Sequence, residues 1–153
     1  LAIGRYFNVE FSEIFSALAG YLPKNNRSQW LEGKKYKIFM DAYNANPSSM
    51  EVAIKAFAEE EGKKVLIMGD MFELGEHAAS EHKLLLNIAE ELNFEKIILV
   101  GSEFVKANKD VNHLAFENTS LAKEYLINND LKADKVMLKA SRGVGLEKLV
   151  EVL

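Results

Sequence analysis

Three short stretches of the sequence combine acidic, amide and cationic side chains in a way that suits ligand binding. They cover residues 41–47, 69–76 and 139–143. Their candidate polar side chains, apart from the asparagines, are Asp41, Asp70, Glu73, Ser141 and Arg142. An arginine beside a small hydroxyl residue suits a carboxylate or a phosphate, because the guanidinium is a forked donor. Together these groups predict a ligand site without naming the ligand.

Each polar stretch directly follows an apolar run that is typical of a buried strand. Such runs occur at residues 36–40, 65–68, 97–100 and 136–138, with a weaker one at 113–116. Between them, apolar residues recur at helical spacing around residues 50–57, 84–92, 121–126 and 146–153. Strands that alternate with helices indicate a parallel sheet covered on both faces. The predicted fold class is therefore α/β, a three-layer, mostly parallel, Rossmann-like sheet with helices on both faces.

In such a sheet the three polar stretches leave the strands at the same edge, where open parallel sheets bind their ligands. We therefore expect their side chains to surround one crevice. A plainer interpretation exists for each stretch. Asp41 and the asparagines are common turn residues, residues 69–75 can be a simple connection that buries Met71 or Phe72, and residues 141–143 can be a helix entry.

The first 33 residues do not show the alternation of strands and helices that is predicted for the rest of the chain. Apolar residues at helical spacing predict a short amphipathic helix closed by Gly20. A polar turn at residues 23–27 follows, and residues 28–32 suit a short strand. Residues 33–35 would turn that strand toward residues 36–40, which makes a hairpin at a domain boundary.

Two helix starts carry capping signals. Ser48, with Glu51 three residues later, has the form of a capping box. Asn118, Thr119 and Ser120 offer several caps for a later helix. We therefore expect the helix after the first polar stretch to begin near Ser48.

The composition limits the classes of function. The 153 residues suit about one domain, and the net charge of −4, from 19 basic and 23 acidic residues, favours neither nucleic acid nor a membrane surface as partner. Cysteine is absent, which excludes disulfides, thiolate metal sites and cysteine nucleophiles and favours a cytoplasmic location. Because the chain starts at Leu1 without an initiator methionine, we expect a fragment of a longer protein.

Several catalytic signatures are missing from the sequence. Phe57 stands where a Gly-x-x-x-x-Gly-Lys-[Ser/Thr] phosphate loop would begin, and Lys148 stands where a dinucleotide fingerprint requires glycine. His77 and His82 are five residues apart, about 140° round a helix, so they do not share a face as metal ligands should. We expect packed or solvent-facing histidines and no histidine metal site.

Three strings of sequence resemble a known enzyme family. They are DAYNANPSSM at residues 41–50, GDMFELG at residues 69–75 and KASRG at residues 139–143. In this order and spacing they closely resemble the C-terminal domain of the Mur ligases, and the first string is the most diagnostic. The resemblance covers essentially the whole chain. It implies that residues 1–33 are the tail of a central ATPase domain with a linker, and that residues 34–153 are the C-terminal domain.

The resemblance implies an ATP-dependent amide ligase of peptidoglycan synthesis, which adds D-alanyl-D-alanine to UDP-N-acetylmuramoyl-tripeptide. In that family ATP phosphorylates the tripeptide carboxylate, and the amine of the dipeptide attacks the acyl phosphate. The phosphate loop, the magnesium ligands and a carbamylated lysine lie in the central domain, and the sugar nucleotide binds in the N-terminal domain. The fragment would contribute contacts to ATP and to the dipeptide, and it would be inactive alone.

Carried over residue by residue, the resemblance assigns an ATP contact to five side chains. Arg27 would reach the nucleotide phosphates and Asp41 the ribose. Tyr43, Asn44 and Asn46 would lie near the adenine and the hinge between domains.

The resemblance assigns the dipeptide to the third string. Ser141 and Arg142 would position D-alanyl-D-alanine, whose free carboxylate a guanidinium is suited to hold. The family often has glycine where this chain has Ala140, which changes the freedom of the local backbone but leaves the polar pair intact.

Two other classes of function stay open. The first is a stand-alone flavodoxin-like binding or phosphoacceptor signalling module, which Asp41 and Lys139 at two strand ends would suit. It is opposed by Gly101 and Ser102, which follow the run at residues 97–100 without an acceptor aspartate. The second is a domain that only mediates assembly, but no apolar stripe beyond the helix faces that the core needs is evident.

Overall fold

A six-stranded mixed sheet forms the centre of the computed structural model, which describes residues 1–21 and 26–153 and leaves out the side chain of Asp110. The strands are β1 Gln29–Glu32, β2 Lys37–Asp41, β3 Lys64–Gly69, β4 Lys96–Val100, β5 Leu114–Phe116 and β6 Lys135–Lys139. Their order across the sheet is β1-β2-β6-β3-β4-β5. The β1–β2 pair is antiparallel and the other four pairs are parallel, which confirms the predicted fold class.

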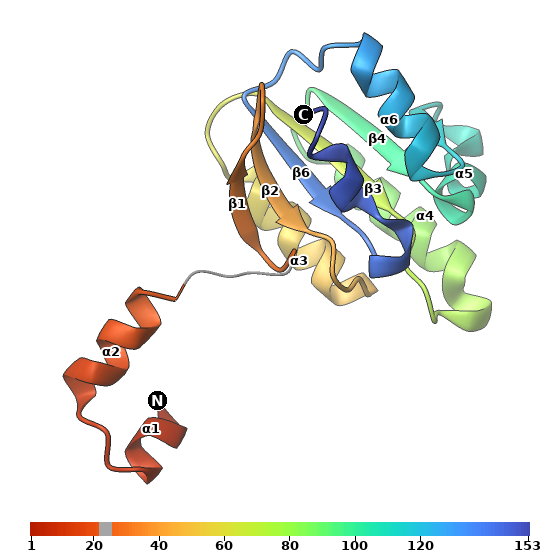
Figure 1. Cartoon of the computed structure of the whole chain (residues 1–153). Coiled ribbons are helices and arrows are strands. Elements are labelled where there is room, and N and C mark those ends of the chain that lie inside the picture. The colour runs from red at the N-terminus through yellow and green to blue at the C-terminus, as the bar shows by residue number, and fades with distance from the viewer. Residues whose placement is uncertain (22–25) are drawn as a thin grey trace.

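Helices cover both faces of this sheet (Figure 1). The α-helices are α1 Ala2–Tyr6, α2 Phe11–Ala19, α3 Pro47–Ala58, α4 Ala78–Glu90, α5 Ser102–Ala107 and α6 Thr119–Asn128. Short 3₁₀ helices are η1 Gly75–His77, η2 Asn108–Asp110, η3 Arg142–Val144 and η4 Leu146–Leu149. Helices α3, α4 and α5 share one apolar core with the sheet, whereas α6 and η4 share the other.

The apolar runs are continuous because successive side chains of a strand point to opposite faces of the sheet, and both faces are covered. In β3, Val65 and Ile67 belong to the core under α6, and Leu66 and Met68 belong to the core under α3 and α4. All six residues of β3 are buried. A strand that is covered on both faces needs apolar side chains at every position, not at every second one.

The register of the three neighbouring strands β2, β6 and β3 places the polar stretches at one edge. Asp41 at the end of β2 pairs with Lys139 at the end of β6, and Met68 of β3 pairs with the same Lys139. Side chains nearly a hundred residues apart in the chain therefore meet beyond the carboxyl ends of adjacent strands, as expected for a parallel sheet.

The first helix of the sheet domain starts earlier than the predicted capping box. Asn46, not Ser48, is the N-cap of α3: its side chain accepts a hydrogen bond from the Ser49 N–H at 2.9 Å, and the Ser49 Oγ bonds the Asn46 N–H in return. Pro47 occupies the first helical position, where its missing N–H costs nothing. The prediction at Ser48 and Glu51 was wrong because Asn46 and Pro47 together make the stronger start.

One further helix prediction was wrong, and one short helix was not predicted. The period at residues 146–153 predicted a helix, but the segment is the 3₁₀ turn η4, which follows Gly145 in the left-handed conformation. Helix α5 was not predicted, because its six residues are too few to show a period. Asn118 caps α6 as expected, with its side chain accepting from the Leu121 N–H at 3.1 Å.

The N-terminal segment contains two helices that pack on each other (Figure 1). The predicted amphipathic helix is α2, which ends at Gly20, and α1 was not predicted. A Cβ at Gly4 would lie 2.6 Å from Cδ1 of Ile14, so the two helices touch there. The predicted polar turn falls largely on residues 23–25, which lie outside the described residues. The hairpin of β1 and β2 that follows it is confirmed.

Candidate functional site

A polar pocket of about 390 Å³ opens beside the carboxyl ends of β2 and β6. Its lining contains all five residues that we predicted to contact ATP, together with two serines and a lysine. The lining residues are Arg27, Ser28, Asp41, Tyr43, Asn44, Asn46, Ser49 and Lys139. The structure therefore gathers into one place side chains that lie as far apart in the sequence as Arg27 and Lys139.

Asp41 is held from two sides at the wall of this pocket. Its Oδ1 accepts hydrogen bonds from the backbone N–H of Ser28 at 3.1 Å and from the Ser28 hydroxyl at 3.3 Å. Its Oδ2 lies 2.9 Å from the ammonium of Lys139. A carboxylate offers about four lone-pair positions, so these bonds leave Asp41 able to accept from a ligand hydroxyl.

Two arginines from distant parts of the chain lie close to the Tyr43 ring. The guanidinium carbon of Arg27 lies 3.7 Å from the centre of the Tyr43 ring, and that of Arg142 lies 5.2 Å from it. A hydrogen bond from Arg27, reinforced by the positive charges of Arg27 and Arg142, holds the pKa of Tyr43 below its ordinary value. Two guanidinium groups so close together create a positive potential that suits a phosphate or a carboxylate.

The two predicted asparagines of the first polar stretch differ in their local roles. Asn46 caps α3 and also accepts a hydrogen bond from the Ser48 hydroxyl at 3.0 Å. Asn44 is exposed, and its backbone carbonyl oxygen accepts a hydrogen bond from the Lys139 ammonium at 2.8 Å. Both asparagines thus hold the loop in place, and both still line the pocket.

The third polar stretch is tied to the second through Ser141. The hydroxyl of Ser141, which is buried, accepts a hydrogen bond from the Phe72 N–H at 3.0 Å, and its own N–H donates to the Asp70 carbonyl at 3.1 Å. A Cβ at Gly143 would lie 2.6 Å from the Phe72 ring, so the ring rests on that glycine. Ser141 is not in the lining of the polar pocket, whereas the exposed side chain of Arg142 reaches Tyr43 at its rim.

Asp70 does not face the crevice, contrary to the expectation. It is buried, and its two oxygens accept hydrogen bonds from the N–H groups of Glu103 and Phe104 at 3.0 Å each, at the start of α5. Gly101 makes room for it, because a Cβ there would lie 2.2 Å from the Asp70 carboxyl carbon. Glu73 is exposed on its loop, in a left-handed backbone conformation, and it is not in the pocket lining.

The sequence did not reveal the role of His82, which is fully buried beneath the second polar stretch. Its Nε2 accepts a hydrogen bond from the Met71 N–H at 3.0 Å, and its Nδ1 bonds the Ala78 carbonyl at 2.6 Å. His82 is thus a packed histidine, one of the two expected outcomes, and it fixes the loop that carries Phe72.

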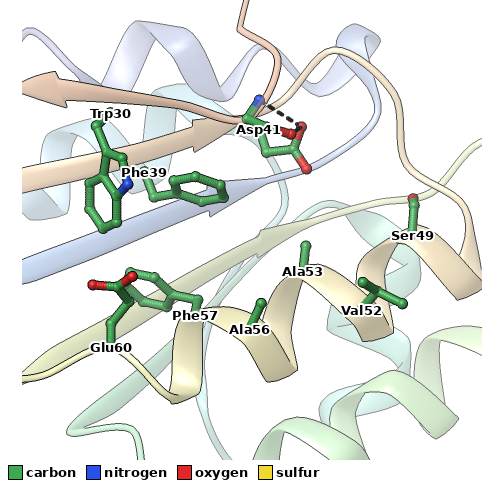
Figure 2. Close-up of a pocket in the computed structure, with 10 residues that line it drawn as sticks. Trp30, Phe39, Asp41, Ser49, Val52, Ala53, Ala56, Phe57 and Glu60 are labelled. Atoms are coloured by element: carbon green, nitrogen blue, oxygen red, sulfur yellow. Dashed lines mark hydrogen bonds between the residues drawn. The ribbon is translucent and has the colours of Figure 1, made fainter. Parts of the chain in front are cut away.

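An apolar groove of about 360 Å³ adjoins the polar pocket (Figure 2). Trp30 and Phe39 from the sheet form one wall, and Phe57 lies opposite them on α3. The groove and the pocket share three lining residues, which are Ser28, Asp41 and Ser49. Asp41 therefore marks the boundary between an aromatic surface and a polar one.

The described residues, 1–21 and 26–153, contain no group of three or more histidine, aspartate or glutamate side chains placed to hold a metal ion. Within the same residues, the helices are too short or too polar for any of them to cross a membrane.

An open, mostly parallel α/β sheet with a polar pocket at its carboxyl edge, whose lining includes Arg27 and Lys139, is the arrangement in which such sheets bind their ligands. The family model described as "Mur ligase, glutamate ligase domain" matches residues 26–143. The chain belongs to the Mur ligase family.

Relatives that it matches include UDP-N-acetylmuramoyl-tripeptide–D-alanyl-D-alanine ligases. The chain is 40% identical over 118 residues to the protein of Buchnera aphidicola subsp. Acyrthosiphon pisum, which covers 74% of this chain and 26% of that one. It is 30% identical over 164 residues to the protein of Bacillus subtilis, which covers 100% of this chain and 36% of that one. The chain thus spans only 26% and 36% of the lengths of these two relatives.

Solved structures give the same picture. MurF from Acinetobacter baumannii superposes with a TM-score of 0.80 at 29% identity, over 97% of this chain and 34% of that one. MurF ligase from Thermotoga maritima in complex with ADP superposes with a TM-score of 0.81 at 27% identity, over 99% of this chain and 35% of that one. The shared part is the portion of those proteins that carries the sheet described above.

Proposed function

We propose that this chain is the C-terminal part of an ATP-dependent ligase that joins D-alanyl-D-alanine to UDP-N-acetylmuramoyl-tripeptide in peptidoglycan synthesis. The observation that carries the proposal is the polar pocket, which brings Arg27, Asp41 and Tyr43 together at the carboxyl edge of the sheet. The printed names of the relatives support the choice of substrates, and the ADP complex of the Thermotoga maritima protein supports the nucleotide.

In this proposal Asp41 accepts hydrogen bonds from the ribose hydroxyls, and Arg27 binds the phosphates. Tyr43, Asn44 and Asn46 contact the adenine or the adjoining hinge. The Arg142 guanidinium holds the carboxylate of the dipeptide, and Ser141 fixes the loop beside it. The proximity of Arg27 and Arg142 at Tyr43 supports this division, because the phosphoryl group and the incoming dipeptide must meet in one site.

The reaction follows from the family resemblance. An oxygen of the tripeptide carboxylate attacks the terminal phosphorus of ATP and ADP leaves; the dipeptide amine then attacks the acyl carbon and phosphate leaves. The residues described here bind, orient and exclude water from the acyl phosphate, which water would hydrolyse. We assign magnesium to the nucleotide and to the preceding ATPase domain, and we place the reaction in the cytoplasm.

We further propose that residues 1–33 are the tail of that central ATPase domain with its linker, and residues 34–153 the C-terminal domain. The large apolar side chains exposed on α1 and α2, such as Ile3, Tyr6 and Phe15, support this, because surfaces of that kind are normally covered. The phosphoacceptor alternative is not favoured, because the chain belongs to the Mur ligase family.

The direct test uses the full-length protein that carries this chain. We expect release of ADP and phosphate only when ATP, UDP-N-acetylmuramoyl-tripeptide and D-alanyl-D-alanine are all present, and no turnover by residues 1–153 alone. Omission of each substrate in turn is the control. Turnover without the dipeptide, or none with all three substrates, would contradict the proposal.

Arg142→Ala tests the assignment of the dipeptide. We expect the KM for D-alanyl-D-alanine to rise about tenfold or more, because a charge-assisted bond to its carboxylate is lost, while the KM for ATP changes far less. The matched control is Arg5→Ala, which removes an arginine from α1, remote in sequence from the pocket. An unchanged dipeptide KM in Arg142→Ala would remove Arg142 from that role.

A further inference from the structure

Lys139 is a buried lysine that the sequence did not single out as a ligand-binding residue. Its side chain is only 2% exposed, although it lies at the wall of the polar pocket. A buried ammonium is costly unless charges and hydrogen bonds compensate it. Two partners do so here: the Asp41 carboxylate at 2.9 Å and the Asn44 carbonyl oxygen at 2.8 Å.

Stability alone does not explain this arrangement. Replacement of a buried ion pair by apolar residues of similar size is often neutral or stabilising. Lys139 also ends β6, a central strand whose neighbouring residues Val136, Met137 and Leu138 are fully buried and apolar. A core that needed only packing would continue that pattern with another apolar residue.

The partners of Lys139 show what its charge organises. Asp41 accepts a hydrogen bond from Ser28 on Oδ1 and forms an ion pair with Lys139 through Oδ2. These two contacts fix the orientation of its carboxylate. The bond to Asn44 fixes the middle of the loop that runs from β2 to α3. That loop is also tied at its start, where the Ala42 N–H donates to the Asn26 carbonyl at 2.9 Å, and at its end by the Asn46 cap.

An ammonium has three N–H donors, and two of them are directed at Asp41 and Asn44. Because the side chain is almost fully covered, Lys139 reaches a ligand through these two partners. A preorganised acceptor binds more tightly than one that must be ordered during binding.

We propose that Lys139 is a positioning residue for the nucleotide, which acts by orienting the Asp41 carboxylate and the Asn44 carbonyl. This inference rests on the proposed function, because it takes ATP as the ligand of the polar pocket.

The test compares Lys139→Met with Lys135→Met in the full-length protein. Lys135 begins the same strand and its ion pair with Glu60 is also partly buried, but it does not line the polar pocket. We expect Lys139→Met to raise the KM for ATP about tenfold and to leave the KM for D-alanyl-D-alanine within about twofold. Lys135→Met should leave both constants within about twofold. Equal increases in both KM values, or an unchanged KM for ATP, would overturn the proposal.

A double-mutant cycle keeps the proposal testable if Lys139→Met folds poorly, because Asp41→Asn together with Lys139→Met leaves no unpaired buried charge. If Lys139 acts largely through Asp41, the double variant has nearly the same KM for ATP as Asp41→Asn alone. If the increases in the KM for ATP from the two single substitutions multiply in the double variant, Lys139 acts independently of Asp41. That result would overturn the proposal.

Amide hydrogen exchange separates failure of this inference from failure of the proposed function. Loss of Lys139 should speed exchange at residues 42–46 and at Ser28 in the chain itself, whether or not the full-length protein is a ligase. An inactive wild-type protein with faster exchange in Lys139→Met would refute the ligase assignment and keep the positioning role. Unchanged exchange would overturn the positioning role.

Discussion

The Tyr43 ring contacts two arginines that lie far apart in the sequence. Arg27 precedes the sheet and Arg142 follows its last strand, yet both lie over the Tyr43 ring. Their positive charges favour the phenolate, so the phenol ionises more easily than a free tyrosine. Because the folded-state pKa is lowered, ionised Tyr43 stabilises the fold at alkaline pH, and this contribution is lost as the pH falls through the folded-state pKa.

Arg27→Ala should raise the pKa of Tyr43 toward its ordinary value, because the hydrogen bond and nearest positive charge are removed. The measurement is an ultraviolet titration of phenolate absorbance, taken as the difference between each protein and its Tyr43→Phe counterpart. Arg5→Ala should leave the titration unchanged. Identical curves for Arg27→Ala and the wild type would show that Arg27 does not contact Tyr43 in solution.

Gly101 is required for the position of Asp70. With φ at 124°, its backbone conformation is rare for any residue with a side chain, and a Cβ would lie 2.2 Å from the Asp70 carboxyl carbon. Gly75 also has a positive φ, at 54°, but an added Cβ would meet nothing within 4 Å. Gly75 is therefore a comparison site at which an added side chain meets left-handed backbone strain but no steric clash.

Gly101→Ala should lower the free energy of unfolding by about 3 kcal/mol, from strain and from the displaced carboxylate, whereas Gly75→Ala should cost about 1 kcal/mol. Denaturant unfolding of both variants measures the difference. Equal losses would mean that Asp70 moves aside without cost.

Helices α3 and α6 begin in the same way but face different surroundings. Each starts at an asparagine whose side chain accepts from a backbone N–H three residues later, Asn46 for α3 and Asn118 for α6. Asn46 also lines the polar pocket, and Asn118 does not. This pair allows the capping role to be separated from a role in nucleotide binding.

Asn46→Ala and Asn118→Ala should each lower the free energy of unfolding by about 1 kcal/mol, because each loses one cap. In the full-length protein only Asn46→Ala should raise the KM for ATP. Equal KM values for the two variants would confine Asn46 to its capping role.

The strands were predictable because a sheet covered on both faces requires continuous apolar runs, and each run proved to be a strand. The exact starts and types of the helices were harder to predict. Helix α3 begins at the Asn46 cap with Pro47 and not at Ser48, and the expected last helix is a 3₁₀ turn that follows Gly145. Helix α5 is too short for a period to show.

The described residues 1–21 form a helical pair, and the described residues 26–153 contain the sheet and the helices that cover it. In the pair, Ile14 is the one buried side chain of α1 and α2. The match to the family model begins at residue 26, whose carbonyl already bonds the sheet domain through Ala42. The stability of the sheet domain should therefore depend little on what precedes it.

Removal of residues 1–25 should change the free energy of unfolding of the sheet domain by less than about 1 kcal/mol, because it takes away little buried surface. Denaturant unfolding of residues 26–153 and of the whole chain, followed by the fluorescence of Trp30, makes the comparison. A loss of several kcal/mol would mean that the helical pair packs on the sheet in solution.

The candidate site was predictable in outline, because strand order and the common edge bring three polar loops together in any parallel sheet of this kind. Its details depend on contacts distant in sequence. Asp70 was expected in the crevice, but the missing side chain at Gly101 lets it turn to the start of α5. Lys139 was expected at a strand end, but its direct contact with Asp41 follows only from the register of β2 against β6.

That register has a consequence for how the protein can change over generations. Asp41 and Lys139 face each other across adjacent strands, so loss of either one leaves the other as a lone charge in a nearly dry place. Each single substitution is therefore harmful, while a joint exchange for two neutral residues can preserve the fold. We expect lineages to keep both residues or to replace both, with few intermediates that carry only one.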